Sequence, residues 1–101
     1  MRWAFEGVKE MAAAKVRFQP TPNPNAGKFV VDRPVVEGKA SKSFYSAEQA
    51  AGEPLAAALF EIEGVQSLFM VEDFVTVTKR PDAAWPDLAQ RVTDAIERGM
   101  G

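Results

Sequence analysis

The stretch VQSLFMVEDFVTVTK, residues 65–79, decides the fold. Val65–Val71 and Phe74–Lys79 are rich in β-branched and aromatic residues, which favour strands, and two residues separate them. The pattern predicts a β-hairpin with Glu72-Asp73 as its turn. Such turns need positive φ angles and favour Asn-Gly or Asp-Gly, so Glu72 predicts a tip that is mildly strained or displaced by one residue.

Three further strands are predicted before this hairpin. Residues 16–19 alternate apolar and polar side chains, as a half-buried strand does, and residues 27–31 and 41–45 are the other two candidates. Between these two, residues 32–40 contain Pro34, which predicts a loop or an edge segment.

Helix signals follow the third strand. Ser46 and Gln49 have the spacing of a capping box, which predicts a short helix from Ser46 that Gly52 interrupts. Pro54 suits the first turn of a helix and predicts a second helix, which ends at Gly64.

A longer helix is predicted over residues 83–98, with Asp82 as its N-cap. Leu88, Val92 and Ile96 recur at helical spacing, so one face of this helix is apolar and packs on the sheet.

These elements predict an α+β fold, because the strands come in runs and do not alternate singly with helices. We expect a two-layer sandwich with a mainly antiparallel sheet of about five strands and about two to three helices on one face. A chain of 101 residues, 47% of them hydrophobic, holds one core, so a single domain is expected over residues 15–101. Residues 1–14 are expected to form a flexible tail, in which residues 1–10 are either frayed or an over-long start assignment. A docking peptide built on Trp3 and Phe5 is the alternative.

The chain contains no cysteine and no histidine. Their absence excludes disulfides, thiolate nucleophiles, Cys/His metal or iron–sulfur sites and histidine acid–base catalysis. We therefore expect no enzyme activity, no metal and no cofactor. No apolar run approaches the roughly 20 residues that span a bilayer, and the N-terminus lacks a leader pattern, so a cytoplasmic location without membrane contact is expected.

The proline-rich loop over residues 20–25 is the first candidate site. Alternate prolines stiffen this segment into extended geometry. It is either a rigid connector between two strands or a preorganised recognition surface, since a stiff loop loses little entropy on binding. The candidate protein-binding residues of this segment are Pro22, Asn23, Pro24 and Asn25, with Lys28 beyond it.

The hairpin tip is the second candidate site. Met70 and Phe74 are expected to act as apolar anchors for a partner protein, and Glu72 and Asp73 as an acidic rim. The alternative is a small-ligand or enzymatic cleft that uses Glu72, Asp73 and Lys79, since paired carboxylates can support acid–base chemistry.

An RNA-binding sheet is the third possibility. Phe18, Phe29 and Phe44 would form its stacking platform if they were exposed between basic residues. The net charge of −2 and the need for these rings in a small core argue against nucleic acid.

Charge is uneven along the chain, because residues 15–42 carry mainly basic and residues 43–73 only acidic charges. The two segments either neutralise each other or leave an acidic face for a basic partner.

Taken together, these segments resemble the N-terminal domain of Nfu/NifU-type iron–sulfur scaffold proteins. The resemblance covers residues 16–97 and is carried by PTPNPNA at 20–26, KF at 28–29, PVV at 34–36, FYSAE at 44–48, PLA at 54–56, FEIEGV at 60–65 and DFVTVTK at 73–79.

The resemblance implies a compact α+β module for targeting or protein contact in cluster delivery. In this family a separate C-terminal domain with a CxxC motif holds the cluster, and this chain has no cysteine. The expected function is therefore a non-catalytic adaptor that is not itself a cluster ligand. The expected partners are CxxC-type scaffold or client proteins, and the expected state is a monomer.

Overall fold

The computed structural model describes residues 14–36, 38 and 40–100. Five strands and two helices are assigned in this part of the chain: β1 (Val16–Pro20), β2 (Ala26–Val31), β3 (Ser41–Phe44), α2 (Pro54–Phe60), β4 (Val65–Val71), β5 (Phe74–Lys79) and α3 (Trp85–Met100). The predicted tail falls on residues 1–14, of which residues 1–13 lie outside the described part. Ala14 is buried at 2% exposure and packs in the core.

The strands form one antiparallel sheet in the order β1-β2-β5-β4-β3. The predicted hairpin is its centre, with Val71 paired to Phe74 and Glu72-Asp73 as the turn. Glu72 has a φ of 50°, so the predicted strain at the tip is confirmed.

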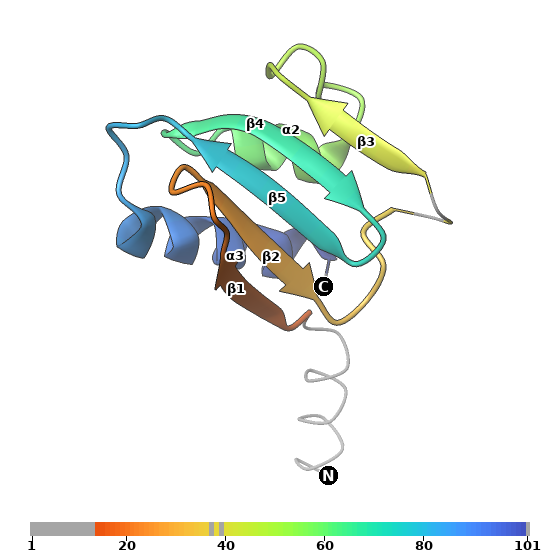
Figure 1. The fold of residues 1–101 in the computed structure, drawn as a ribbon. Coiled ribbons are helices and arrows are strands. Elements are labelled where there is room, and N and C mark those ends of the chain that lie inside the picture. The colour runs from red at the N-terminus through yellow and green to blue at the C-terminus, as the bar shows by residue number, and fades with distance from the viewer. Residues whose placement is uncertain (1–13, 37, 39, 101) are drawn as a thin grey trace, which may run out of the picture.

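Both helices cover the same face of the sheet (Figure 1). Alternating strand residues point to that face and bury their side chains against the helices, as the burial pattern of β2 and β5 demonstrates. The largest fully buried side chains are Phe29, Leu59, Met70, Val75, Val77, Val92 and Ile96. The fold is therefore the predicted α+β sandwich.

The short helix predicted from Ser46 is wrong. The chain there forms turns, in which the Gln49 amide donates to the Ser46 hydroxyl at 3.2 Å and the Gln49 side chain accepts from the Tyr45 amide at 2.7 Å. The hydrogen bonds of a capping box therefore form here although no helix follows. Glu53 is extended because it precedes Pro54, so a helix that began at Ser46 could have little more than one turn before it ended.

The last helix begins at Trp85, two residues later than predicted, and Asp82 is not its N-cap. The first helical hydrogen bond runs from the Leu88 amide to the Ala84 carbonyl. Asp82 lies in a turn closed by the Ala83 amide and the Arg80 carbonyl, and its carboxylate is 3.6 Å from the Arg80 guanidinium.

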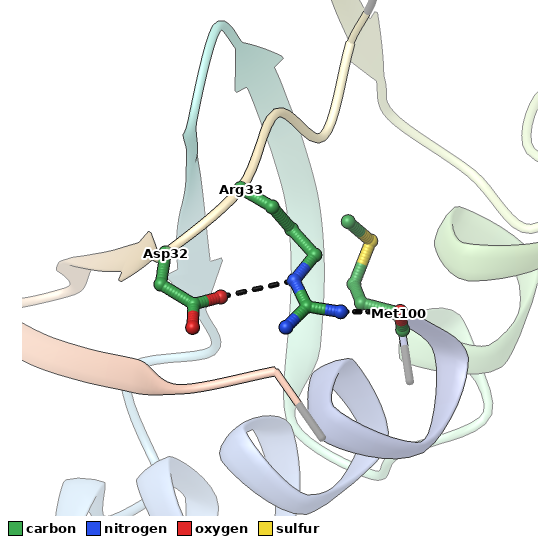
Figure 2. A network of polar contacts seen from close by, with 3 residues as sticks. All are labelled: Asp32, Arg33 and Met100. Atoms are coloured by element: carbon green, nitrogen blue, oxygen red, sulfur yellow. Dashed lines mark hydrogen bonds and ion pairs between the residues drawn. The ribbon is translucent and has the colours of Figure 1, made fainter. Parts of the chain in front are cut away.

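A polar network joins the loop after β2 to the end of α3 (Figure 2). The Arg33 guanidinium donates to the Asp32 carboxylate at 3.0 Å and to the Met100 carbonyl at 3.3 Å. A cation at the C-terminus of a helix satisfies a carbonyl that has no partner within the helix and complements the helix dipole.

Candidate functional site

The face of the sheet opposite the helices is the candidate site, and we call it the open face. Neither α2 nor α3 lies over it (Figure 1). Strand pairing and alternation assign its side chains, which are Arg17, Gln19, Ala26, Lys28, Val30, Ser41, Ser43, Ser67, Phe69, Val71, Phe74, Thr76 and Thr78.

The centre of the open face is apolar. Val30, Phe74 and Val71 are cross-strand neighbours on β2, β5 and β4, and all three are partly exposed. Phe69 lies one pair further along β4 and is 39% exposed. A partly exposed apolar cluster on a sheet is typical of a surface that contacts another molecule.

A basic side chain borders this cluster. The Lys28 ammonium lies 4.1 Å from the centroid of the Phe74 ring, within the range of a cation–π interaction. Two residues predicted as separate parts of a binding site, Lys28 and Phe74, are therefore in contact on one surface.

Met70 was predicted as an apolar anchor, and this is wrong. It is 1% exposed and its side chain belongs to the core, because residues on β4 alternate between the two faces. The aromatic residue beside it, Phe69, is the exposed one and was not among the predicted binding residues. Alternation along β4 means that the side chains of Phe69 and Met70 point to opposite faces of the sheet, but it does not determine which of them faces the helices.

The proline-rich loop over residues 20–25 is folded by its own side chains. The Thr21 hydroxyl donates to the Ala26 carbonyl at 2.9 Å and accepts from the Asn23 amide at 3.2 Å, while the Asn23 side chain accepts from the Asn25 amide at 2.9 Å. Asn and Thr side chains that bond the backbone two residues away are a usual way to build a turn. Pro22, Asn23 and Pro24 are exposed.

Tertiary contacts hold this loop against the rest of the domain. The Trp85 indole donates to the Pro24 carbonyl at 2.8 Å, and the Lys79 amide donates to the Asn25 carbonyl at 2.7 Å. The Lys79 ammonium donates to the Asn25 side chain at 3.1 Å and to the Arg80 carbonyl at 3.3 Å. Lys79 is only 7% exposed, so its side chain supports the loop.

The structure does not bring Lys79 into one cleft with Glu72 and Asp73, as the alternative prediction required. Phe74 begins β5 beside the hairpin tip and Lys79 ends it, so these two residues are about 17 Å apart at about 3.4 Å per residue. The hollow beside Glu72 and Asp73 is lined by Pro34, Val36 and Gly38.

Backbone hydrogen bonds hold the hairpin tip. The Glu72 carbonyl accepts from the Val35 amide at 2.7 Å and from the Val36 amide at 3.2 Å. The side chains of Glu72 and Asp73 are exposed, as solvated charges at a turn usually are. The tip and the proline-rich loop lie at opposite ends of the paired strands β2 and β5.

The aromatic platform predicted for RNA is also wrong. Phe29 and Phe44 are 0% and 8% exposed and point into the core. Phe18 packs against Phe29 and Trp85, with ring centroids 5.0 and 5.2 Å apart. These rings are on the helix-covered face and cannot stack on a base.

Within residues 14–36, 38 and 40–100, no group of three or more acidic side chains is placed to hold a metal ion. No helix in the same residues is both long and apolar enough to cross a bilayer.

Comparison with known proteins adds a family. The family model "Scaffold protein Nfu/NifU N terminal" matches residues 16–100. NifU-like protein 5, mitochondrial, of Arabidopsis thaliana is 36% identical over 100 residues, which are 95% of this chain and 36% of that protein. The human NFU1 iron-sulfur cluster scaffold homolog, mitochondrial, is 39% identical over 90 residues, which are 84% of this chain and 35% of that protein. The chain thus spans about a third of the length of these relatives.

Solved structures share the fold. The crystal structure of protein SAV1430 from Staphylococcus aureus matches with a TM-score of 0.70 and 30% identity, over 82% of this chain and 99% of that one. The solution structure of a NifU-like protein from Saccharomyces cerevisiae matches with a TM-score of 0.73 and 22% identity, over 86% of this chain and 78% of that one, and supports the fold alone.

Proposed function

The chain belongs to the Nfu/NifU N-terminal family, and from that premise we propose that it is a non-catalytic protein-interaction module of iron–sulfur cluster assembly. It contacts CxxC-type scaffold or client proteins and does not hold the cluster itself. The absence of cysteine from this chain supports the proposal that another domain or protein holds the cluster, since cluster ligation depends on thiolates.

The observation that carries the proposal is the open face. A sheet with helices on one side buries its apolar residues on that side, and the other side usually carries polar groups. Here that other side presents Phe69, Val71 and Phe74 together, beside Lys28. Partly exposed aromatic side chains at the centre of a patch are typical anchors of protein interfaces.

The proline-rich loop and the hairpin tip flank this surface. The exposed residues Pro22, Asn23 and Pro24 are held rigidly at one end, and Glu72 and Asp73 project at the other. We assign these residues to the rim of the interface. A preorganised rim lowers the entropic cost of binding.

NMR titration of the isotope-labelled chain with a purified CxxC scaffold domain tests the proposal. Binding should shift the amide signals of Lys28, Phe69 and Phe74, and Phe69→Ser should weaken binding by about tenfold or more, as expected for an interface anchor. Tyr45→Ser is the matched control, because Tyr45 is the other large exposed hydrophobic residue in the described part of the chain, at 70%, and it follows the end of β3, outside the strands that form the open face.

The proposal is wrong if neither a scaffold domain nor an iron–sulfur client protein shifts any signal of the folded chain, or if Phe69→Ser and Tyr45→Ser affect binding equally.

The names of the Arabidopsis and human relatives carry the word mitochondrial, and the cytoplasmic location expected for this chain stays a prediction that cell fractionation tests.

A further inference from the structure

The open face carries a charge opposite to that of the whole chain. The protein has 14 acidic and 12 basic residues, yet no strand side chain on the open face is a carboxylate. The charged strand residues there are Arg17 and Lys28, both basic. Neither makes an ion pair with a described carboxylate, unlike Lys42, which pairs with Glu53 at 2.8 Å.

The two cations are close together. Arg17 pairs with Val30, so Lys28 stands diagonally across from Arg17 on the neighbouring strand. Diagonal positions on one face are about 7–8 Å apart, within reach of two carboxylates on one partner segment. The apolar row that starts at Val30 and continues to Phe74 and Val71 begins beside them. The open face is therefore basic at Arg17 and Lys28 and apolar at the adjacent residues Val30, Phe74 and Val71.

The Lys28–Phe74 contact favours a carboxylate over a stacked RNA base at this position. A base that stacks on Phe74 must compete with the Lys28 ammonium, which lies 4.1 Å from the ring centroid. A carboxylate can pair with that ammonium while it stays over the ring.

We propose that the open face binds a segment of a partner protein that carries carboxylates next to apolar side chains. The carboxylates pair with Arg17 and Lys28, and the apolar side chains pack on Phe69 and Val71. This inference rests on the proposed function in one respect, namely that the open face contacts protein. Charge complementarity of this kind steers association and fixes orientation.

Defined probes test the charge of the occupant. The full chain is titrated by NMR with a short synthetic peptide that alternates Glu with Leu and Phe, with the same peptide carrying Gln in place of Glu, and with an oligouridylate RNA. The Glu peptide should shift the amides of Lys28, Phe69 and Phe74 and bind about tenfold more tightly than the Gln peptide, with an affinity that falls as salt is added.

Charge reversal supplies the matched variants. Lys28→Glu should abolish the preference for the Glu peptide, whereas Arg98→Glu, the same kind of change at an exposed position on α3, should leave it intact. Lys28→Gln should reduce the preference as well, and it provides a second test if Lys28→Glu unfolds the domain.

The inference is overturned if the Glu and Gln peptides bind equally, if the shifted signals lie outside the open face, or if the RNA binds that face more tightly than the Glu peptide. Its failure is distinct from failure of the proposed function. A scaffold domain that binds without any charge preference refutes the acidic occupant alone. A Glu peptide that binds while every scaffold and client protein fails to bind refutes the proposed partners alone.

Discussion

The indole N–H of Trp85 donates a hydrogen bond of 2.8 Å to the carbonyl of Pro24, across 61 residues of sequence. Trp85 is the first residue of α3, and Pro24 lies at the exposed turn between β1 and β2. The bond ties the position of the proline-rich loop to the position of the helix. A loop with three prolines is stiff by itself, but this contact decides which way it points.

Replacing Trp85 should loosen the loop. Trp85→Phe keeps an aromatic ring against Phe18 but removes the N–H, so we expect a loss of about 0.5–1.5 kcal/mol in the free energy of unfolding. Amide exchange at Asn25 and Ala26 should become faster. Urea denaturation and hydrogen exchange followed by NMR measure the two effects. Trp85→Ala should cost more, because it also removes the packing; unchanged exchange in Trp85→Phe would contradict a role for the hydrogen bond.

Gly27 should not tolerate a larger side chain. A Cβ atom there would clash with the Phe18 ring and lie 3.0 Å from Trp85 Cη2. Phe18 cannot easily move because it packs between Phe29 and Trp85. We expect Gly27→Ala to destabilise the domain by about 1–3 kcal/mol in thermal or urea unfolding.

Gly52→Ala is the control for that substitution. A Cβ atom at Gly52 has no neighbour within 4 Å and the backbone there has no positive φ. The change should be neutral or should stabilise the domain by up to about 1 kcal/mol, because alanine lowers the conformational entropy of the unfolded chain. Equal losses at the two glycines would argue against the packing explanation.

Relief of backbone strain at the hairpin tip should stabilise the protein. The φ of 50° at Glu72 costs a non-glycine residue about 1–2 kcal/mol, and glycine adopts it freely at an entropic cost of about 0.5–1 kcal/mol. Glu72→Gly should therefore raise the free energy of unfolding by up to about 1 kcal/mol, measured by urea denaturation. Asp73, which lacks a positive φ, should lose stability when changed to glycine. A loss in both variants would count against strain at Glu72.

Acid should weaken the contact between Asp32 and Arg33. The hydrogen bond from the Arg33 guanidinium, helped by the Lys15 backbone, lowers the pKa of Asp32 below its ordinary 3.8. A carboxyl with a lowered pKa in the folded state contributes stability above about pH 3.8, and the contribution is lost as the pH falls through the folded value.

Asp32→Asn tests this pH dependence. The stability difference between the parent protein and Asp32→Asn should be largest near neutral pH and should shrink in acid. Urea denaturation at a series of pH values measures the difference, and NMR titration of the Asp32 carboxyl measures its pKa directly. A difference that is constant across the whole pH range would refute the role of this ionised carboxylate.

Local signals predicted most of the fold. The five strands lie where alternation and β-branched residues indicated them, and the strained turn at Glu72 followed from the residues that a two-residue hairpin needs. The capping box at Ser46 misled because its hydrogen bonds also form in an isolated turn. The prediction that Asp82 is the N-cap of the last helix was wrong because Asp82 lies in a turn closed by the Ala83 amide and the Arg80 carbonyl, and the helix starts after this turn.

The candidate site was predicted less well than the fold. Lys28 and Phe74 were named as separate members of a binding site, and the register of β2 against β5 brings them into contact. Glu72 and Lys79 were predicted to share a cleft, but they lie at opposite ends of the extended strand β5. Contacts between distant segments, such as Lys79 with Asn25, have no signal in a single sequence.

The sequence by itself determined the strands, the hairpin and the exclusion of thiol and imidazole chemistry, because composition and side-chain alternation are local properties of the chain. Only the tertiary structure decided that Met70 is in the core and Phe69 on the open face. The two residues are adjacent and both apolar, so alternation puts them on opposite sides of the sheet but does not assign the sides. Which of the two residues is buried depends on which face of the sheet the helices cover, and the packing of helices from other parts of the sequence determines that face.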